Sequence, residues 1–239
     1  MGKTRRNIRA PIALLIFFAL VGCAGLPADQ AAGTPAARVA AASLFSVQVS
    51  GISVGAAVAM SCAPCGGPVL VTNAHVMRQA GSRFELRPAS GGEAVAGTLL
   101  ATSPRIDLAL LSLPRGALPA ATGPAPERGA PVWAAGPEGL GRAVVWGAVS
   151  RPAVRMRHFG PGFAARLGAL MGFSGGPVVG GDGRLLGLTT ALTHPGEATV
   201  LAALTGMDLD GLLRGNRREV FVLSIQAIET ELARLAPQP

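Results

Sequence analysis

Short apolar runs, separated by clusters of glycine, proline and serine, occupy most of the chain from residue 46 onward. Runs rich in valine and leucine are typical of β-strands, whereas helical periodicity is clear only near the C-terminus. The first series of expected strands covers residues 46–58, 69–72, 84–88, 94–101 and 108–113. The second series covers residues 132–135, 143–150, 177–179, 185–190, 200–204 and 220–223. This pattern predicts a mainly β fold in which the proline-rich stretch 114–131 joins two lobes.

The spacing of apolar residues changes after Ser224. Helical intervals separate the apolar residues Ile225, Ile228, Leu232 and Leu235, and charged residues lie on the other faces. The Ser224 hydroxyl is a good N-cap, because it can accept a hydrogen bond from an otherwise unpaired backbone N–H group. We predict a C-terminal helix over residues 224–236 that packs on the second lobe.

The N-terminus has the features of an export signal. Residues 3–9 carry four positive charges, and residues 11–21 form an apolar run that is too short to span a membrane. The junction LVGC at residues 20–23 resembles the bacterial lipobox, which implies cleavage before Cys23 and a lipid anchor on its thiol. An ordinary signal peptide cleaved near Ala28 is the alternative.

Residues 23–42 are dominated by alanine, glycine and proline and show no apolar alternation. This composition predicts a flexible tether between the anchor and a folded body that begins at Ser43. Together with a lipoprotein signal peptide over residues 1–22, it implies an exported protein of the bacterial cell envelope. Its lipid would hold it on a membrane, facing the periplasm or the cell exterior.

The chain of 239 residues has a formal net charge of +8, but this charge is concentrated at the N-terminus. Beyond the export segment, 17 arginines face 13 acidic residues. The densest basic stretch, residues 151–157, lacks the interleaved aromatic residues that stack on bases in single-strand binders. We therefore expect no nucleic-acid partner. The 49% hydrophobic and 14% charged residues instead favour a folded domain with a sizeable core.

Cys62 and Cys65 remain as a pair once Cys23 carries the lipid, and export would place them in an oxidising compartment. A short local disulfide, or a pair of inert thiols, is the first interpretation. Redox catalysis is an alternative, although the pair lies between two strand-like runs and not in the βαβ context of thioredoxin-like sites. Zinc binding is weaker still, because no second ligand pair has the right spacing. We predict neither a metal nor a cofactor.

Three segments carry candidate catalytic chemistry, in the order His, Asp, Ser. They are VTNAHV around His75, IDLALL around Asp107 and GFSGGP around Ser174. A serine nucleophile needs an imidazole to accept its proton, and that imidazole needs a carboxylate to hold its tautomer and stabilise its charged form. Each segment alone has an ordinary structural explanation, but the three together, in this order, predict a catalytic triad.

The residues around Ser174 also suit an oxyanion hole. Glycines allow a tight turn that exposes backbone N–H groups to the charge developing on the substrate carbonyl oxygen. We assign this role to the backbone of Gly172, Phe173 and Ser174, with the N–H groups of Gly172 and Ser174 as the main donors.

At these motifs the chain resembles the trypsin-like serine peptidase superfamily, and within it the protease domain of the bacterial HtrA (Deg) branch. Further segments that resemble this branch are AAGP (134–137), GAVS (147–150) and RLLGLTTA (184–191). The resemblance implies an all-β fold of two six-stranded antiparallel β-barrels with a C-terminal α-helix. A single peptidase domain would cover residues 43–239, with the barrels over residues 43–114 and 131–223 and the helix over 224–236.

Two features depart from the HtrA pattern. Phe173 precedes the predicted nucleophile at a position where HtrA members often carry Asn and digestive enzymes Asp, which leaves open how the active loop is held. The chain also has no room for the C-terminal PDZ modules of many HtrA proteins, and so PDZ-driven substrate recruitment is not expected.

Substrate specificity is predicted from the floor of the pocket. Tryptic cleavage requires an acid there, whereas the equivalent residue by resemblance, six before Ser174, is Gly168. Thr190, Ala191 and Leu192 would form the edge that pairs with an extended substrate, and Leu192 would restrict the pocket. We expect a preference for small or medium aliphatic residues.

The sequence therefore predicts an exported serine endopeptidase that hydrolyses polypeptides of the cell envelope through an acyl-enzyme on Ser174. His158 and His194 are interpreted as solvent-exposed or loop residues, since the triad needs only one imidazole. The alternative function is a catalytically inactive protease fold that serves as a binding module at the envelope. The physiological substrate and the oligomeric state stay open.

Overall fold

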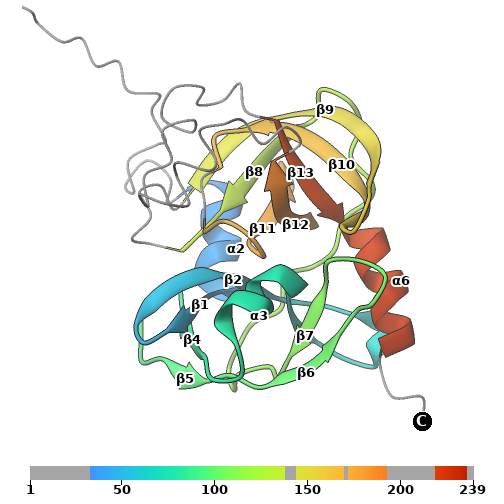
Figure 1. Cartoon of the computed structure of the whole chain (residues 1–239). Helices are drawn as coiled ribbons and strands as arrows, with labels where there is room; N and C mark the ends of the chain where they lie inside the picture. Colours follow the sequence, from blue (N-terminus) through green and yellow to red (C-terminus); the bar gives the residue numbers. More distant parts are fainter. Residues whose placement is uncertain (1–32, 138–143, 170–171, 193–218, 236–239) are drawn as a thin grey trace, which may run out of the picture.

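The computed structural model describes residues 33–137, 144–169, 172–192 and 219–235, which fold into two β lobes with helices packed beside them (Figure 1). The first lobe is a seven-stranded antiparallel sheet in the order β5-β4-β1-β2-β3-β7-β6. Its strands are β1 (Leu44–Val49), β2 (Ile52–Met60), β3 (Val69–Thr72), β4 (Glu85–Pro88), β5 (Val95–Ala96), β6 (Leu99–Thr102) and β7 (Ala109–Leu111). The two edge strands, β5 and β6, are consecutive along the chain but do not pair with each other. The curled sheet therefore does not close into a barrel.

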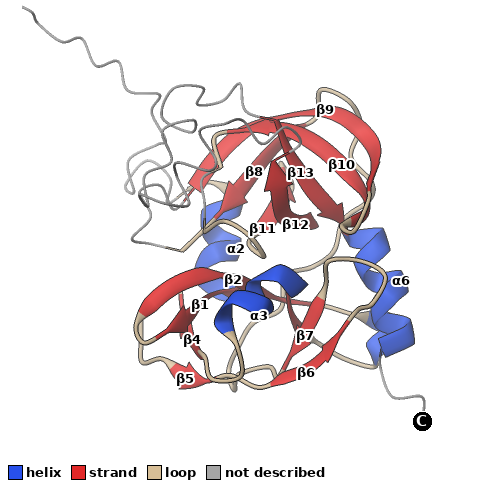
Figure 2. Ribbon diagram, in the orientation of Figure 1, coloured by secondary structure: helices blue, strands red, loops and turns tan. Residues whose placement is uncertain are grey.

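The second lobe is a closed six-stranded barrel in the order β10-β13-β12-β11-β8-β9. Its strands are β8 (Pro131–Ala135), β9 (Val144–Met156), β10 (Gly160–Leu167), β11 (Pro177–Gly180), β12 (Leu185–Leu192) and β13 (Glu219–Ser224). The two lobes and the C-terminal helix confirm the expected all-β architecture (Figure 2). In detail, the first lobe has seven strands and an open sheet where a closed six-stranded barrel was expected.

Strand β10 was missing from the expected strands, and its sequence GPGFAARL explains why. Glycine is unfavourable in a strand interior, and the short apolar stretch does not alternate with polar residues. Gly162 is nevertheless required there, because a Cβ at this position would overlap the carbonyl oxygen of Val222 on the neighbouring strand β13. The expected strand over residues 200–204 lies outside the described residues.

Three apolar clusters stabilise this arrangement. One fills the second barrel, around Phe163, and another fills the first lobe, around Leu70. The third joins the lobes and includes Leu44 from β1, Leu188 from β12 and Ile228 from the C-terminal helix. Because buried apolar contacts of this kind are close-packed, the lobes form a rigid frame for the segments between them.

Residues 35–42 are not part of a flexible tether, as the composition had indicated, but belong to helix α2 (Pro35–Ser43). The Thr34 hydroxyl accepts from the N–H of Ala37 at 3.1 Å, and Pro35 occupies the first turn, where its missing N–H costs nothing. Alanine has the highest helix propensity, and so an alanine-rich stretch becomes helical when it can dock. Here α2 packs on β8 and β11, with Ala36 fully buried.

Two further α-helices lie in the described residues. The sequence pattern did not predict α3 (Ala74–Ala80), but it did predict α6 (Ile225–Leu235). The predicted N-cap of α6 is confirmed, since the N–H of Ala227 donates to the Ser224 hydroxyl at 3.3 Å. Within the described ranges, no helix has the length and apolar character that a membrane crossing requires.

Candidate active site

His75 lies in the first turn of α3, directly after β3. Its ring Nδ1 is 2.6 Å from Oδ2 of Asp107, and its backbone N–H donates to Oδ1 of the same carboxylate at 2.9 Å. The side chain of Asp107 is 2% exposed and that of His75 is 21% exposed. Because an ionised carboxylate only accepts hydrogen bonds, this geometry places the ring proton on Nδ1 and leaves Nε2 as an acceptor.

The loop that presents Asp107 is held by both lobes. The backbone N–H of Asp107 donates at 3.1 Å to the carbonyl of Phe159, in the turn between β9 and β10. Its carbonyl accepts from Asn73 Nδ2 at 3.0 Å, and the same amide donates to the Thr190 hydroxyl on β12 at 3.1 Å. One buried asparagine therefore links the helix that carries His75, the loop that carries Asp107 and a strand of the second lobe.

Ser174 lies in the turn before β11, and this turn docks on the first lobe. The N–H of Ala56 donates to the Ser174 carbonyl at 2.8 Å. Gly175 has a φ of +83°, and a Cβ there would overlap the Ala56 carbonyl and the Thr72 hydroxyl, so only glycine fits this approach. Since Thr72 lies three residues before His75, the serine turn rests on the strand end that delivers the histidine. The Ser174 hydroxyl is oriented toward the carbonyl of Thr190, at 3.4 Å.

Phe173 shows how the serine turn is held. Its side chain is completely buried in the apolar cluster of the second barrel. A Cβ at Gly136 would lie 2.5 Å from Cδ2 of the Phe173 ring, so the ring packs directly on the backbone of residue 136. The turn is therefore anchored by hydrophobic burial immediately beside Ser174.

The backbone N–H groups of the serine turn fall into two sets, according to whether they have a hydrogen-bond acceptor. Those of Gly175 and Gly176 donate at 2.8 Å to the carbonyls of Thr189 and Phe173, respectively. Those of residues 172–174 have no acceptor among the described residues. Gly172 has a φ of +92°, which glycine adopts without strain. The three free N–H groups are the ones that the sequence assigned to an oxyanion hole.

The predicted substrate-binding residues lie at the ends of two barrel strands. Gly168 is buried directly after β10, and Thr190 is 3% exposed, with its hydroxyl donating to the Leu188 carbonyl at 3.0 Å. Ala191 and Leu192 pair with Phe221 and Val220 on one side. The neighbouring strand β11 pairs with β12 only from Leu185 to Leu188, so the other edge of residues 190–192 meets no described strand. Their role in substrate binding stays a prediction.

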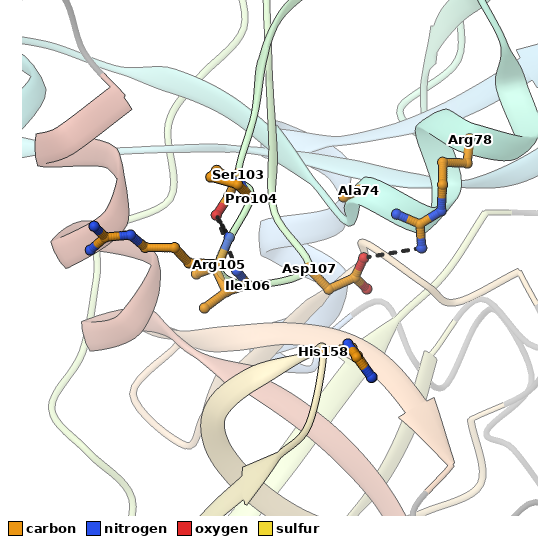
Figure 3. A pocket seen from close by; sticks show the side chains of 8 residues that line it. All are labelled: Ala74, Arg78, Ser103, Pro104, Arg105, Ile106, Asp107 and His158. Atoms are coloured by element: carbon orange, nitrogen blue, oxygen red, sulfur yellow. Dashed lines mark hydrogen bonds and ion pairs between the residues drawn. The ribbon is translucent and has the colours of Figure 1, made fainter.

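A polar cavity of about 450 Å³ lies beside Asp107, between α3, the loop before β7 and the β9–β10 turn (Figure 3). Arg78, Arg105 and His158 line it. Arg78 Nη2 is 3.9 Å from Asp107 Oδ1, but the Arg78 side chain is 70% exposed and the ion pair is therefore weak. His158 is exposed, whereas His194 lies outside the described residues.

Cys62 and Cys65 form a disulfide at the short 3-10 helix η1 (Ala63–Cys65), which packs against α6. Cys62 is 2% exposed. No group of three or more His, Cys, Asp or Glu side chains in the described part of the chain is placed to hold a metal ion. Cys23 lies outside the described residues.

A family model for the trypsin-like peptidase domain matches residues 49–188, which include all three predicted triad segments. The chain belongs to the trypsin-like peptidase family. This confirms the resemblance at the level of the superfamily. No curated protein sequence matches the chain.

Solved structures of the protease Rv3671c from M. tuberculosis share the fold. Its active form matches with a TM-score of 0.64 and 18% sequence identity, covering 90% of this chain and 90% of that one. A serine-to-alanine mutant in an inactive form also gives a TM-score of 0.64 at 18% identity, covering 90% of this chain and 97% of that one. The trypsin-like double-barrel fold of this trypsin-like peptidase is thus confirmed over 90% of the chain.

The sequence alone did not predict two interactions that hold this site, the hydrogen bonds of the Asn73 side chain and the burial of the Phe173 ring. Asn73 stands inside the VTNAHV segment, so its position next to His75 was a signal, but its bonds to Asp107 and Thr190 join residues far apart in the chain. Phe173 was noted as unusual, and its burial required knowledge of what lies beneath the turn.

Proposed function

We propose that this trypsin-like peptidase is a serine endopeptidase in which Ser174 is the nucleophile, His75 the general base and Asp107 the carboxylate that orients the base. The observation that carries the proposal is the pair of hydrogen bonds that the buried Asp107 carboxylate makes with the ring and the backbone N–H of His75. This arrangement fixes the neutral tautomer whose Nε2 can accept a proton. The docking of the serine turn on the strand that precedes His75 supports the choice of Ser174.

The proposed reaction has two stages. The Ser174 hydroxyl transfers its proton to Nε2 of His75 while its oxygen attacks the scissile carbonyl, and the imidazolium then protonates the leaving amine. Water then gives a proton to His75 while its oxygen attacks the ester carbonyl, and the imidazolium returns the proton to the Ser174 oxygen as its bond to the acyl carbon breaks. Asp107 stays ionised throughout and stabilises the charged ring. The free N–H groups of residues 172–174 support an oxyanion hole for both tetrahedral intermediates, with no cofactor in any step.

Fluorophosphonate labelling tests this assignment. The mature protein should label on Ser174 and hydrolyse an unfolded protein substrate, and Ser174→Ala should abolish both while leaving thermal unfolding unchanged. Labelling that persists in Ser174→Ala would place the nucleophile elsewhere. A wild-type protein that unfolds cooperatively but neither labels nor cleaves would favour a binding module with a silent protease fold.

We further propose that the enzyme prefers small or medium aliphatic residues at the cleaved position. Gly168, which the resemblance assigns to the pocket floor, carries no charge and is buried between the buried residues Leu167 and Ala169, which supports an apolar pocket. A proteome-derived peptide library, analysed by mass spectrometry, should yield cleavage after such residues. A profile dominated by Arg or Lys would contradict the proposal.

We propose that the protein is exported and held at the cell envelope by a lipid on Cys23, where its substrates would be envelope proteins. The cationic segment, the apolar run and the LVGC junction support this. The disulfide between Cys62 and Cys65 agrees with an oxidising compartment. Mass spectrometry of the native N-terminus should find a diacylated cysteine, whereas an unmodified start further along the chain would remove the anchor.

A further inference from the structure

Glu231 is a buried carboxylate that the proposed reaction does not use. It lies in the last two turns of α6, and the residue is 4% exposed. Its neighbours on the helix, Ile228 and Leu232, are buried in the apolar cluster between the lobes. A carboxylate at such a position is costly unless its oxygens accept hydrogen bonds, so its partners indicate why it is there.

The main partner of Glu231 lies 128 residues earlier, in the loop that presents Asp107. The Ser103 hydroxyl donates to Oε1 of Glu231 at 2.8 Å, and this bond is buried. Arg234 Nη1 is 3.3 Å from Oε2, but the Arg234 side chain is 54% exposed, so that bond is the weaker of the two. The carboxylate therefore acts chiefly on Ser103.

The Ser103 hydroxyl organises the loop that ends at Asp107. It accepts from the backbone N–H of Arg105 at 3.0 Å and from that of Ile106 at 3.1 Å. Figure 3 shows this turn, with Asp107 following Ile106. A hydroxyl has one proton and two lone pairs. Since both lone pairs serve the loop, an acceptor outside the loop has to take the proton, and Glu231 is that acceptor.

We infer that Glu231 is a positioning residue for Asp107, acting through Ser103. The inference rests on the proposed function, because it assigns Glu231 to the same site. When the Ser103 hydroxyl donates its proton to Glu231, both lone pairs of its oxygen are directed toward the N–H groups of residues 105 and 106. This sets the path of the backbone into Asp107, whose carboxylate must reach both the ring and the N–H of His75.

Other groups near Asp107 do not replace this link. The Phe159 carbonyl and the Asn73 side-chain amide bond the backbone of Asp107 itself, whereas Ser103 and Glu231 hold the turn that precedes it. Arg78 approaches the carboxylate only at 3.9 Å from an exposed position. A misplacement of catalytic groups by about 1 Å can cost roughly 10²-fold in rate, so a partial shift of this turn is expected to cost about tenfold.

The test compares Glu231→Leu with Glu231→Gln in the mature protein. Leucine fills the apolar site but leaves the proton of the Ser103 hydroxyl without its buried acceptor, so some loss of stability accompanies the change. Glutamine keeps a carbonyl oxygen for Ser103. Corrected for the folded fraction, the second-order rate of fluorophosphonate labelling should fall about tenfold in Glu231→Leu and stay within about threefold of wild type in Glu231→Gln. Glu229→Leu, on the same helix, is the matched control and should label at the wild-type rate.

A proton NMR measurement provides a readout that does not need turnover. The Nδ1 proton of His75, in its short bond to Asp107, should give a low-field resonance in the wild type, in Glu231→Gln and in Glu229→Leu. In Glu231→Leu this resonance should shift or broaden. Ser103→Ala should have effects at least as large, because it also removes the two bonds to the loop. Adding Glu231→Leu to Ser103→Ala should change nothing further, because the carboxylate acts on the loop only through Ser103.

Wild-type labelling and an unshifted resonance in Glu231→Leu would overturn the inference. Additive effects of Ser103→Ala and Glu231→Leu would also overturn it. If the wild type itself fails to label, the proposed endopeptidase function fails, and the resonances of the variants still decide whether Glu231 positions Asp107. If Glu231→Leu fails to fold, Ser103→Ala and Glu231→Gln carry the same comparison.

Discussion

Replacing Phe173 by alanine should separate the stability of the barrel from the geometry of its active turn. The ring is completely buried and packs on the backbone at Gly136, so the site cannot collapse when the ring is removed. Loss of burial together with the remaining cavity should cost about 3–5 kcal/mol. Because a domain has a total stability of only about 5–15 kcal/mol, the variant should be marginal but folded at low temperature.

Phe163→Ala is the matched control for this change. Phe163 is equally buried in the same cluster, but it lies on β10 and not beside Ser174. Urea unfolding should therefore show a similar loss of stability in both variants. Only Phe173→Ala should also misplace the N–H groups of residues 172–174, and loss of one oxyanion donor costs about 10²–10³ in rate.

The assay is fluorophosphonate labelling at a low temperature, corrected for the folded fraction of each variant. Phe173→Ala should label at least about 10²-fold more slowly than wild type, whereas Phe163→Ala should stay within a few fold. Equal losses in both variants would show that the aromatic ring contributes only general stability. Wild-type labelling of Phe173→Ala would show that the turn holds its shape without the ring.

Three further changes test other parts of the site. Asp107→Asn should lower kcat/KM by about 10⁴-fold with little loss of stability, because the wrong tautomer of His75 is then favoured, and a loss below tenfold would contradict the assignment. Gly175→Ala should abolish labelling and lower the unfolding temperature, because the φ of +83° and the overlap with Ala56 both oppose a side chain. An active variant would refute the docking of the turn. Reduction and alkylation of the Cys62–Cys65 disulfide should lower the free energy of unfolding, measured by urea titration, by no more than about 2 kcal/mol, because the closed loop is short. Complete unfolding would contradict this.

Much of this site could be predicted from local sequence. The segments around His75, Asp107 and Ser174 carry the proposed reacting groups, and the last also carries the glycines that its turn requires. The C-terminal helix and its Ser224 cap also follow from neighbouring residues, because helical periodicity and capping are local interactions. Strand β10 was missed because the need for Gly162 comes from the neighbouring strand β13 and has no local signal.

Tertiary structure decided how the reacting groups are held. Phe173 looks like a departure from a polar pattern until the barrel interior beneath it is known. The alanine-rich stretch at α2 looks like a linker until its docking on β8 and β11 is known. Glu231 and Ser103 are 128 residues apart, and no pattern within either segment predicts their bond. The chain thus encodes its chemistry in short motifs, whereas the precision of the site depends on contacts between distant residues, which form only when the two lobes pack.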